Sequence, residues 1–394
     1  DWINSIDATY KAGILFPGWG NEDNAVWHPF GFTSVGKEQI PMYDLWSNYQ
    51  DQYDIKDISP LFRSSQAGKI ELDYVKDTYA YQIDCGKLVR FLQQSNPCNY
   101  IKSDVKRVVK NGDDIEKLVL DDGSEIVGDL YIDCTGWKQL LGNDDNIDLT
   151  DRLFIDTALA GRVKYKSDKE QHPYTDCRAL EHGWRWAIPT RSRIGTGYCF
   201  NRSITDPDVV ADAFVKHWDN RISKDELKLL DWKPQRVKHF WKGNLVSIGL
   251  SAGFIEPLES TGLALMIRGI EYLEECMYGC VYNPNYETEV FNIRMKVAFE
   301  SAVDYITMHY TYSQRKGEFW DYVRQNIKKP GMQEFMEGQI NDPTQVTFQN
   351  DRTSSFFGGS NWHVWLLQLM PEIVPKQYWH SLSSDIVPRF QNYI

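Results

Sequence analysis

The stretch "GNLVSIGLSAGFIEPLESTG", residues 243–262, combines a strand-like apolar run with small residues and two glutamates. Gly249 and Gly253 follow the run, and glycine lets backbone approach a ligand closely. Successive backbone N–H groups in such a loop can surround an anion. Glu256 and Glu259 are costly to bury there unless they are hydrogen-bonded, paired with a charge or used chemically. The stretch therefore predicts a buried strand that leads into an anion-binding loop.

A second stretch ends in the same way. "DLYIDCTGW", residues 129–137, is a buried-looking strand that leads into Thr135-Gly136, where the backbone can approach a flat cofactor. An ordinary exit from strand to loop explains either stretch equally well on its own. In this order, the two stretches resemble the second half of a flavin-binding fold of the aromatic-monooxygenase kind. That resemblance implies a set of flavin-contacting positions: Thr135, Gly136, Ile248, Gly249, Gly253 and Pro257.

Composition excludes several classes of protein. The chain of 394 residues is 42% hydrophobic and 25% charged, which is ordinary for a globular protein. A net charge of −12 argues against nucleic-acid binding, because that function needs a basic surface. No apolar run reaches the length of a membrane span, and the first residues do not have the order of a signal peptide, so we expect a cytoplasmic protein. The seven scattered cysteines predict reduced thiols, and we expect no metal site.

The order of predicted elements indicates an α/β protein. Residues 101–133 have the pattern of a β-meander with tight turns at Asn111-Gly112 and Asp122-Gly123. A hairpin is predicted over 184–200, and a helix after Asp206-Pro207. From Leu263 onward helical periodicity dominates. We therefore expect two interleaved regions: an α/β module over 1–265, and a mainly helical substrate-binding region over 266–394.

One motif is absent from the given sequence. A dinucleotide-binding module opens with a strand, G-x-G-x-x-G and a helix, and "GTGYCF" around Gly195 has the wrong spacing for this fingerprint. We therefore expect that the fingerprint belongs to sequence that precedes residue 1, since an α/β body without its first strand would expose a sheet edge.

Further motifs narrow the resemblance to the flavin-dependent halogenases. "GWRWAIP" at 183–189 is similar to the W-x-W-x-I-P signature of that family, and "FIEPLESTG" is similar to its P-L-E-S-T-G stretch. "ATYKAGILFPGW" at 8–19 resembles the segment that carries the family's active-site lysine, and "HPFG" at 28–31 resembles the place where its aromatic substrate stacks. Segments 79–92 and 308–320 also resemble family segments, so the resemblance spans most of the chain. The signature positions are Trp184, Trp186, Ile188 and Pro189.

The resemblance implies a mechanism. In the family, a separate reductase supplies FADH2, which reacts with O2 to give a flavin hydroperoxide; halide attacks it, and hypohalous acid travels to a lysine. By resemblance, Lys11 is that lysine, and Glu259 polarises the halogenating species and accepts the ring proton. Ser260 links the flavin and substrate ends, and Thr261 with Gly262 holds the halide. For Glu256 we expect a structural or flavin-side hydrogen bond.

The expected substrate is an electron-rich aromatic of indole or phenol type. Tryptophan-specific members clamp the amino acid's charged end with tyrosines and an acid, whereas the comparable stretch here is "SNWHVW" at 360–365. We therefore expect a substrate other than free tryptophan. The residues expected to contact it are His28, Phe30, Trp362 and His363.

Two other functions remain open at this point. One is an aromatic hydroxylase, for which the pairing of Lys11 with Glu259 would have no use. The other is a non-catalytic aromatic-ligand binder without flavin, which the flavin content of the protein would reveal. The sequence leaves the number of subunits open, and a homo-oligomer is compatible with it.

Overall fold

A seven-stranded sheet joins the first residues of the chain to its middle. The computed structural model describes residues 2–20, 24–30, 34–35, 40–41, 52–59, 62–63, 79–143, 145–329, 356–357 and 359–369. The strand order is β16-β12-β15-β14-β13-β2-β3, and every neighbouring pair is antiparallel except β13 and β2. The strands are β2 (Gly13–Pro17), β3 (Ala25–Pro29), β12 (Thr157–Val163), β13 (Thr175–Leu180), β14 (Gly183–Pro189), β15 (Ile194–Phe200) and β16 (Lys228–Asp231).

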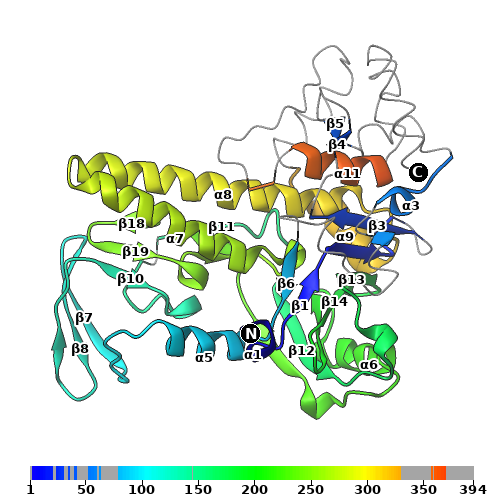
Figure 1. Cartoon of the computed structure of the whole chain (residues 1–394), viewed down its shortest axis with the longest axis horizontal. Coiled ribbons are helices and arrows are strands. Elements are labelled where there is room, and N and C mark those ends of the chain that lie inside the picture. The colour runs from blue at the N-terminus through cyan, green and yellow to red at the C-terminus, as the bar shows by residue number, and fades with distance from the viewer. Residues whose placement is uncertain are drawn as a thin grey trace.

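The predicted hairpin over 184–200 is confirmed as β14 and β15 within this sheet. Their packing depends on a glycine, because a Cβ at Gly197 would lie 2.1 Å from the indole ring of Trp186. The helix predicted after Asp206-Pro207 is confirmed as α6 (Pro207–His217), and the Asp206 side chain accepts from the backbone N–H of Asp208. In Figure 1, α6 lies beside the sheet at the end away from α7 and α8.

The predicted meander is confirmed for its first two strands, and its third strand is confirmed only at residues 125–126. β7 (Val105–Asn111) and β8 (Asp114–Leu120) form the hairpin, and β9 (Glu125–Ile126) adds to it. The segment 125–134 is not one strand, because strand pairing is interrupted over 127–130, where the Gly128 N–H donates to Tyr131 Oη at 2.9 Å. Beyond this interruption, β10 (Tyr131–Asp133) pairs in parallel with β19 (Leu245–Ser247).

The carboxyl ends of β10 and β19 lie at the same edge of their small sheet, which also contains β18 (Trp241–Lys242). Each strand ends close to a short turn of 3-10 helix, η1 (Gly136–Lys138) or η4 (Gly249–Ser251). The two turns are joined by a hydrogen bond from Gln139 Nε2 to the Ser251 carbonyl at 2.9 Å. The two stretches singled out in the sequence are therefore neighbours in space.

Two long antiparallel helices, α7 (Thr261–Cys280) and α8 (Pro284–Tyr312), pack side by side along the molecule (Figure 1). Helix α8 also contacts α9 (Glu318–Asn326) and α11 (Gly359–Leu369). The division into regions 1–265 and 266–394 stays a prediction, and residue 265 lies within α7. The remaining elements are α1 (Trp2–Ser5), β1 (Thr9–Lys11), β4 (Ser34–Val35), β5 (Ile40–Pro41), α3 (Ile55–Ile58), β6 (Ala80–Gln82), α5 (Cys85–Ser95), β11 (Asn146–Asp148), η2 (Asp168–Glu170), η3 (Lys224–Glu226), β17 (Gln235–Val237), β20 (Gly253–Phe254) and η5 (Leu258–Ser260).

One hydrophobic core connects the sheet, the parallel strand pair and the helices. It contains large side chains with less than 2% of their surface exposed, contributed by elements far apart in sequence. Among them are Phe16, Trp19, Trp184, Trp320 and Trp365. The loop over 255–262 crosses this core, so its polar side chains need partners inside the protein.

Candidate active site

The loop between β20 and α7 holds an unusual backbone conformation. Glu259 has φ 61° and Ser260 has φ 58°, so two consecutive residues other than glycine are left-handed. This conformation costs roughly 1–2 kcal/mol per residue and persists only where the surroundings enforce it. Here it kinks the chain between η5 and α7, so that Glu259 contacts β3 and α8 and Ser260 contacts β1, while Thr261 begins α7.

Two histidines hold the Glu259 carboxylate. His28 Nδ1, from β3, lies 2.8 Å from Oε2, and His309 Nε2, from α8, lies 2.7 Å from Oε1. All three side chains are buried. Burial by itself would raise the pKa of Glu259, but the two imidazoles more than offset it and lower the pKa to about 2. Glu259 is therefore a buried carboxylate.

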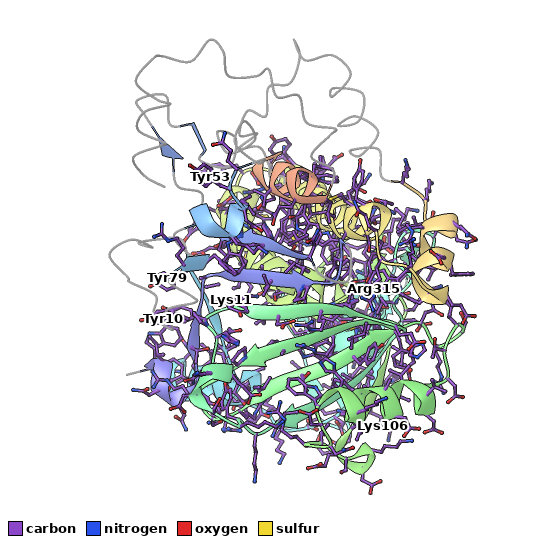
Figure 2. The ribbon with its side chains drawn as sticks, turned by 90° about the vertical axis from the view of Figure 1, so that its right-hand side faces the viewer. Tyr10, Lys11, Tyr53, Tyr79, Lys106 and Arg315 are labelled. Carbon is purple, nitrogen blue, oxygen red and sulfur yellow. The ribbon has the colours of Figure 1, made fainter. Side chains whose placement is uncertain are left out.

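Lys11 ends β1 and reaches the same loop. Its Nζ donates to Ser260 Oγ at 2.8 Å and lies 5.0 Å from the ring centre of Phe30, a cation–π distance. Burial lowers the pKa of Lys11 to about 8, although Cys177 and Glu259 oppose the change. In Figure 2, Lys11 lies inside the edge at which Tyr10, the residue before it, packs against Tyr79. The structure thus brings Lys11, Glu259 and Ser260 together, as the resemblance implied.

Glu256 occupies a separate environment three residues earlier. Tyr310 Oη donates to its Oε1 at 2.6 Å, so the hydrogen bond expected from the sequence is confirmed. Its other oxygen has no hydrogen-bond partner among the described residues, and the nearby Trp184 indole N–H also lacks one. Burial raises the pKa of Glu256 to about 8, against the opposing effect of Tyr310 and Trp184. Glu256 is therefore mostly neutral at pH 7.

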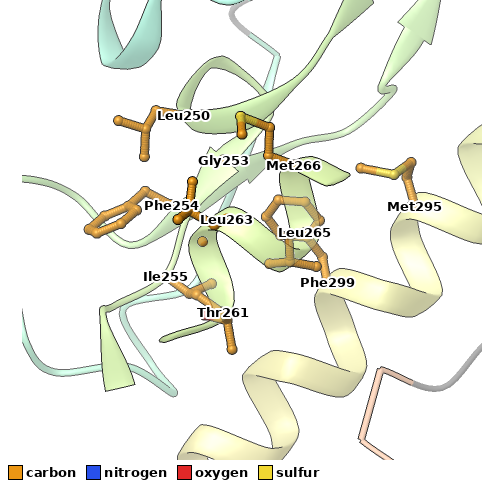
Figure 3. Close-up of a pocket in the computed structure, with 12 residues that line it drawn as sticks. Leu250, Gly253, Phe254, Ile255, Thr261, Leu263, Leu265, Met266, Met295 and Phe299 are labelled. Atoms are coloured by element: carbon orange, nitrogen blue, oxygen red, sulfur yellow. The ribbon is translucent and has the colours of Figure 1, made fainter. Parts of the chain in front are cut away.

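An apolar cavity of about 340 Å³ lies on the other side of the loop (Figure 3). Its size falls in the lower part of the range of about 300–1,000 Å³ that is typical of small-molecule sites. Thr261 and Gly262 line the cavity together with Gly249 and Gly253. Apolar side chains complete the wall: Leu250, Phe254, Ile255, Leu263, Leu265, Met266, Met295 and Phe299.

The residues of this cavity fit a flat cofactor next to an anion. Thr261 Oγ1 is buried and has no hydrogen-bond partner among the described residues, although it lines an apolar cavity. It stands at the N-terminus of α7, where the first backbone N–H groups attract anions. A Cβ at Gly262 would meet nothing within 4 Å, so the space beside it is open. The apolar walls suit the faces of an isoalloxazine ring.

The other expected cofactor positions border this region. Gly136 is left-handed, with φ 74° and open space at its Cβ, and Thr135 Oγ1 donates to the buried Asp133. Ile248 is buried directly before η4, and Pro257 precedes η5. These four residues do not line the cavity over 249–299, so their contact with a cofactor stays a prediction.

The signature residues form one strand, β14. Trp184 is buried, and Trp186 lies on the same face with its ring centre 6.1 Å away. Ile188 and Pro189 end the strand. The signature strand therefore reaches Glu256 through Trp184, and its Pro189 carbonyl accepts from Thr9 Oγ1 in β1, the strand of Lys11.

The expected substrate residues divide into two groups. His28 contacts Glu259, and the Phe30 ring lies beside the Lys11 amine. The ring centres of His28 and Phe30 are 6.4 Å apart. Trp362 in α11 is buried against Tyr305, with ring centres 5.7 Å apart. The side chain of His363 lies outside the described residues.

The sequence alone did not single out four residues of this site. His309 holds Glu259, Tyr310 holds Glu256, and Asn361 Oδ1 lies 2.9 Å from His28 Nε2. The hydroxyl of Tyr305 donates to the Asn361 carbonyl. His309 could have been noticed as a polar residue among largely apolar neighbours in α8, but that pattern does not reveal that Glu259 is its partner.

The described residues contain neither a metal-binding cluster nor a membrane-spanning helix. No group of three or more histidine, cysteine, aspartate or glutamate side chains in these ranges is arranged to hold a metal ion. No helix within them has both the length and the apolar character needed to cross a membrane.

Comparisons with known proteins agree on one family. The model of the tryptophan halogenase family matches residues 1–384. Tryptophan 7-halogenase RebH of Lentzea aerocolonigenes is 26% identical over 94% of this chain and 78% of its own length. Tryptophan 6-halogenase ThaL of Streptomyces albogriseolus is 27% identical over 81% of this chain and 66% of its own length.

Solved structures give the same result. Xcc4156, a flavin-dependent halogenase from Xanthomonas campestris, has a TM-score of 0.85 at 25% identity and covers 100% of this chain and 81% of that one. BrvH, a flavin-dependent halogenase from Brevundimonas sp. BAL3, has a TM-score of 0.82 at 25% identity, over 95% of this chain and 79% of that one. The mixed sheets and helices described above therefore form the expected flavin-binding α/β module.

Proposed function

Since this chain belongs to the tryptophan halogenase family, we propose that it halogenates an electron-rich aromatic ring at Lys11 and Glu259. It is a flavin-dependent halogenase, and such enzymes use FADH2, a halide ion and O2. The observation that carries the site assignment is the buried contact of Lys11 with Ser260, next to the carboxylate of Glu259.

Residues 259–262 of the loop separate the two halves of the proposed reaction. Thr261 and Gly262 line the apolar cavity, whereas Glu259 and Ser260 contact the residues on the opposite side. FADH2 bound against Gly249 and Gly253 would activate O2, and the O2 would supply the oxidising equivalent that converts halide into an electrophilic halogen species, with reduction of the oxygen to water. Thr135, Gly136, Ile248 and Pro257 would support it at the ends of the parallel strands.

Thr261 and Gly262 would hold the halide. The N-terminus of α7 offers backbone N–H groups, and the unpaired Thr261 hydroxyl adds a donor. Thr261→Val replaces that hydroxyl with a methyl group of similar size, and Gly262→Ala adds a methyl group in open space. Both variants should keep their thermal stability and raise the apparent KM for halide. Narrower chloride-35 NMR lines than in wild type would report weaker binding without catalysis; unchanged lines and KM in both variants would exclude this halide site.

Lys11 would present the halogen to the ring. With a pKa of about 8, Lys11 is mostly protonated at pH 7, but roughly a tenth of its amine is uncharged, and that form can bind an electrophile. The contact with Ser260 fixes its direction. Glu259 would take the proton from the ring carbon, and the electron pair of that C–H bond would return to the ring.

We propose an indole or phenol other than free tryptophan as substrate. In the described part of α11, the Asn361 amide contacts His28 and the Trp362 indole packs against Tyr305. These two side chains are not the pair of phenols that would clamp an amino acid. His28 and Phe30 would stack the ring, with Trp362 and His363 nearby. A separate reductase, by analogy with the family, and a cytoplasmic location are proposed with this function.

The deciding experiment incubates the protein with FAD, a flavin reductase, NADH and each halide, against indoles, phenols and tryptophan. Mass spectrometry should show halogenated product that disappears in Lys11→Ala. Lys106→Ala is the matched control, because Lys106 is an exposed lysine away from the site (Figure 2). Hydroxylated product with undiminished yield in Lys11→Ala would establish the hydroxylase instead, and absence of bound flavin would favour the ligand binder.

A further inference from the structure

His309 makes two short contacts whose hydrogens can be assigned. Its Nδ1 lies 2.7 Å from the carbonyl oxygen of Tyr305, one turn earlier in α8. A carbonyl oxygen can only accept, so Nδ1 carries a hydrogen. Its Nε2 lies 2.7 Å from Glu259 Oε1, and two lone pairs at this distance would repel. One hydrogen therefore lies in the contact between His309 and Glu259.

The hydrogen belongs to His309. Burial lowers the pKa of His309, and the contacts with Glu259 and the Tyr305 carbonyl offset this effect only in part. However, the pKa of Glu259 is about 2, so the carboxylate is the poorer holder of a proton. The contact is compatible with an ionised Glu259 only when both imidazole nitrogens of His309 carry hydrogen, which makes His309 an imidazolium.

His28 differs from His309 in what lies behind it. The far nitrogen of His28 faces the side chain of Asn361 at 2.9 Å and the hydroxyl of Tyr305 at 3.5 Å. An amide and a hydroxyl can both change roles between donor and acceptor. Among the described residues, the partner of the far nitrogen of His309 is the backbone carbonyl of Tyr305, which cannot pass a proton on. His309 is therefore a fixed donor.

We propose that His309 is a positioning residue for halogenation, a fixed cationic donor that keeps Glu259 ionised and aligned to receive the ring proton. The inference rests on the proposed role of Glu259 as base. When Glu259 takes the proton, the Nε2–H of His309 stays in place, and the carboxyl group keeps its orientation.

Few other charged groups among the described residues face Glu259 and could keep it ionised. Lys11 on β1 and His28 on β3 are the cationic groups that face Glu259. Cys177 on β13 and Tyr305 on α8 also face it, but burial raises the pKa of each, so both stay neutral. The ring centre of Trp365 lies 3.8 Å from that of His309, and the ring centre of Phe16 lies 5.5 Å from it. These rings shield the imidazole from solvent.

The first test needs no catalysis. Long-range proton–nitrogen NMR spectra of the 15N-histidine-labelled protein, with His309 assigned from His309→Gln, should show both ring nitrogens protonated at pH 7. In Glu259→Gln the same ring should become neutral. An unprotonated Nε2 in the wild-type protein would overturn the proposal, even if halogenation itself is confirmed.

The second test uses the pH profile of kcat/KM. His309→Gln keeps a donor without charge, and His309→Leu removes the donor, so both should raise the acid limb by about one to two pH units. The KM for the aromatic should change less than about twofold. Tyr310→Phe is the matched control, since it removes a buried hydrogen bond from the next residue and should leave the limb unmoved. An equal loss at every pH in the His309 variants would show a purely structural role.

If the wild-type protein does not halogenate any substrate, the proposed function fails, and the NMR spectra still decide the protonation of His309. If it halogenates and the spectra show a neutral ring, only the present inference fails.

Discussion

Glu256 and Glu259 lie three residues apart in one loop, and both are buried, yet their ionisation differs. The pKa of Glu256 is raised to about 8, and that of Glu259 is lowered to about 2. The partners make the difference: His28 and His309 give Glu259 two imidazoles, whereas Tyr310 gives Glu256 a neutral hydroxyl. Burial disfavours the charged form of each acid, and the hydrogen-bond partner decides whether the charged form is nevertheless stabilised. Carboxyl groups whose pKa values are pushed apart in this way indicate a division of roles.

The sharpest way to break the comparison is to neutralise each acid. Glu259→Gln removes the proposed base and should lower kcat by roughly 10²–10⁴. Glu256→Gln copies the neutral acid and should lower kcat less than about tenfold. Steady-state halogenation rates at pH 7 measure both. Equal losses in the two variants would show that the loop as a whole, and not the charge of Glu259, matters for catalysis.

The next effect is on stability against pH. The pKa of Glu256 is higher in the folded than in the unfolded protein. Its contribution to the free energy of unfolding is therefore fully present below about pH 4.5 and is lost as the pH rises to about 8. Glu259 has a depressed pKa, so its stabilising effect is present above about pH 4.5 and is lost as pH falls toward 2. In urea unfolding between pH 5 and 9, Glu256→Gln should therefore lose much less stability than wild type. The same slope in both proteins would mean that Glu256 is ionised throughout.

Removing the Tyr310 hydroxyl should have a smaller effect. Tyr310→Phe leaves the Glu256 Oε1 without its donor, and the free energy of unfolding should fall by about 1–3 kcal/mol. The pKa of Glu256 should rise further, because the hydroxyl stabilises the carboxylate. Urea titrations at pH 6 and 9 measure both changes. A Tyr310→Phe protein as stable as wild type would show that the hydroxyl contributes nothing to the Glu256 site.

The smallest predicted change concerns Ser260, on the Glu259 side of the loop. Ser260→Ala removes the acceptor that aligns Lys11 and should lower kcat by about twofold to tenfold, the equivalent of one hydrogen bond. Thermal unfolding should stay close to that of wild type. A loss as large as that of Lys11→Ala would mean that Ser260 takes part directly in the chemistry.

Local patterns predicted the local elements well. Asp206 and Pro207 predicted α6, and the alternation around Trp184 and Trp186 predicted a hairpin strand, because caps and strand periods depend on neighbours in sequence. The third meander strand was predicted too long, since residues 125–126 pair with β8 but residues 131–133 pair with 245–247 instead. Long-range pairing of this kind leaves no local signal.

Motif resemblance placed Lys11, Glu259 and Ser260 in one site, and the structure brings them together. The sequence by itself thus determined the family, the helix and hairpin signals and the candidate base. Only the tertiary structure decided which glutamate is charged. The reason is physical: the pKa of a buried acid depends on partners such as His28 and His309, which lie 231 and 50 residues away in the chain and reach Glu259 only after folding.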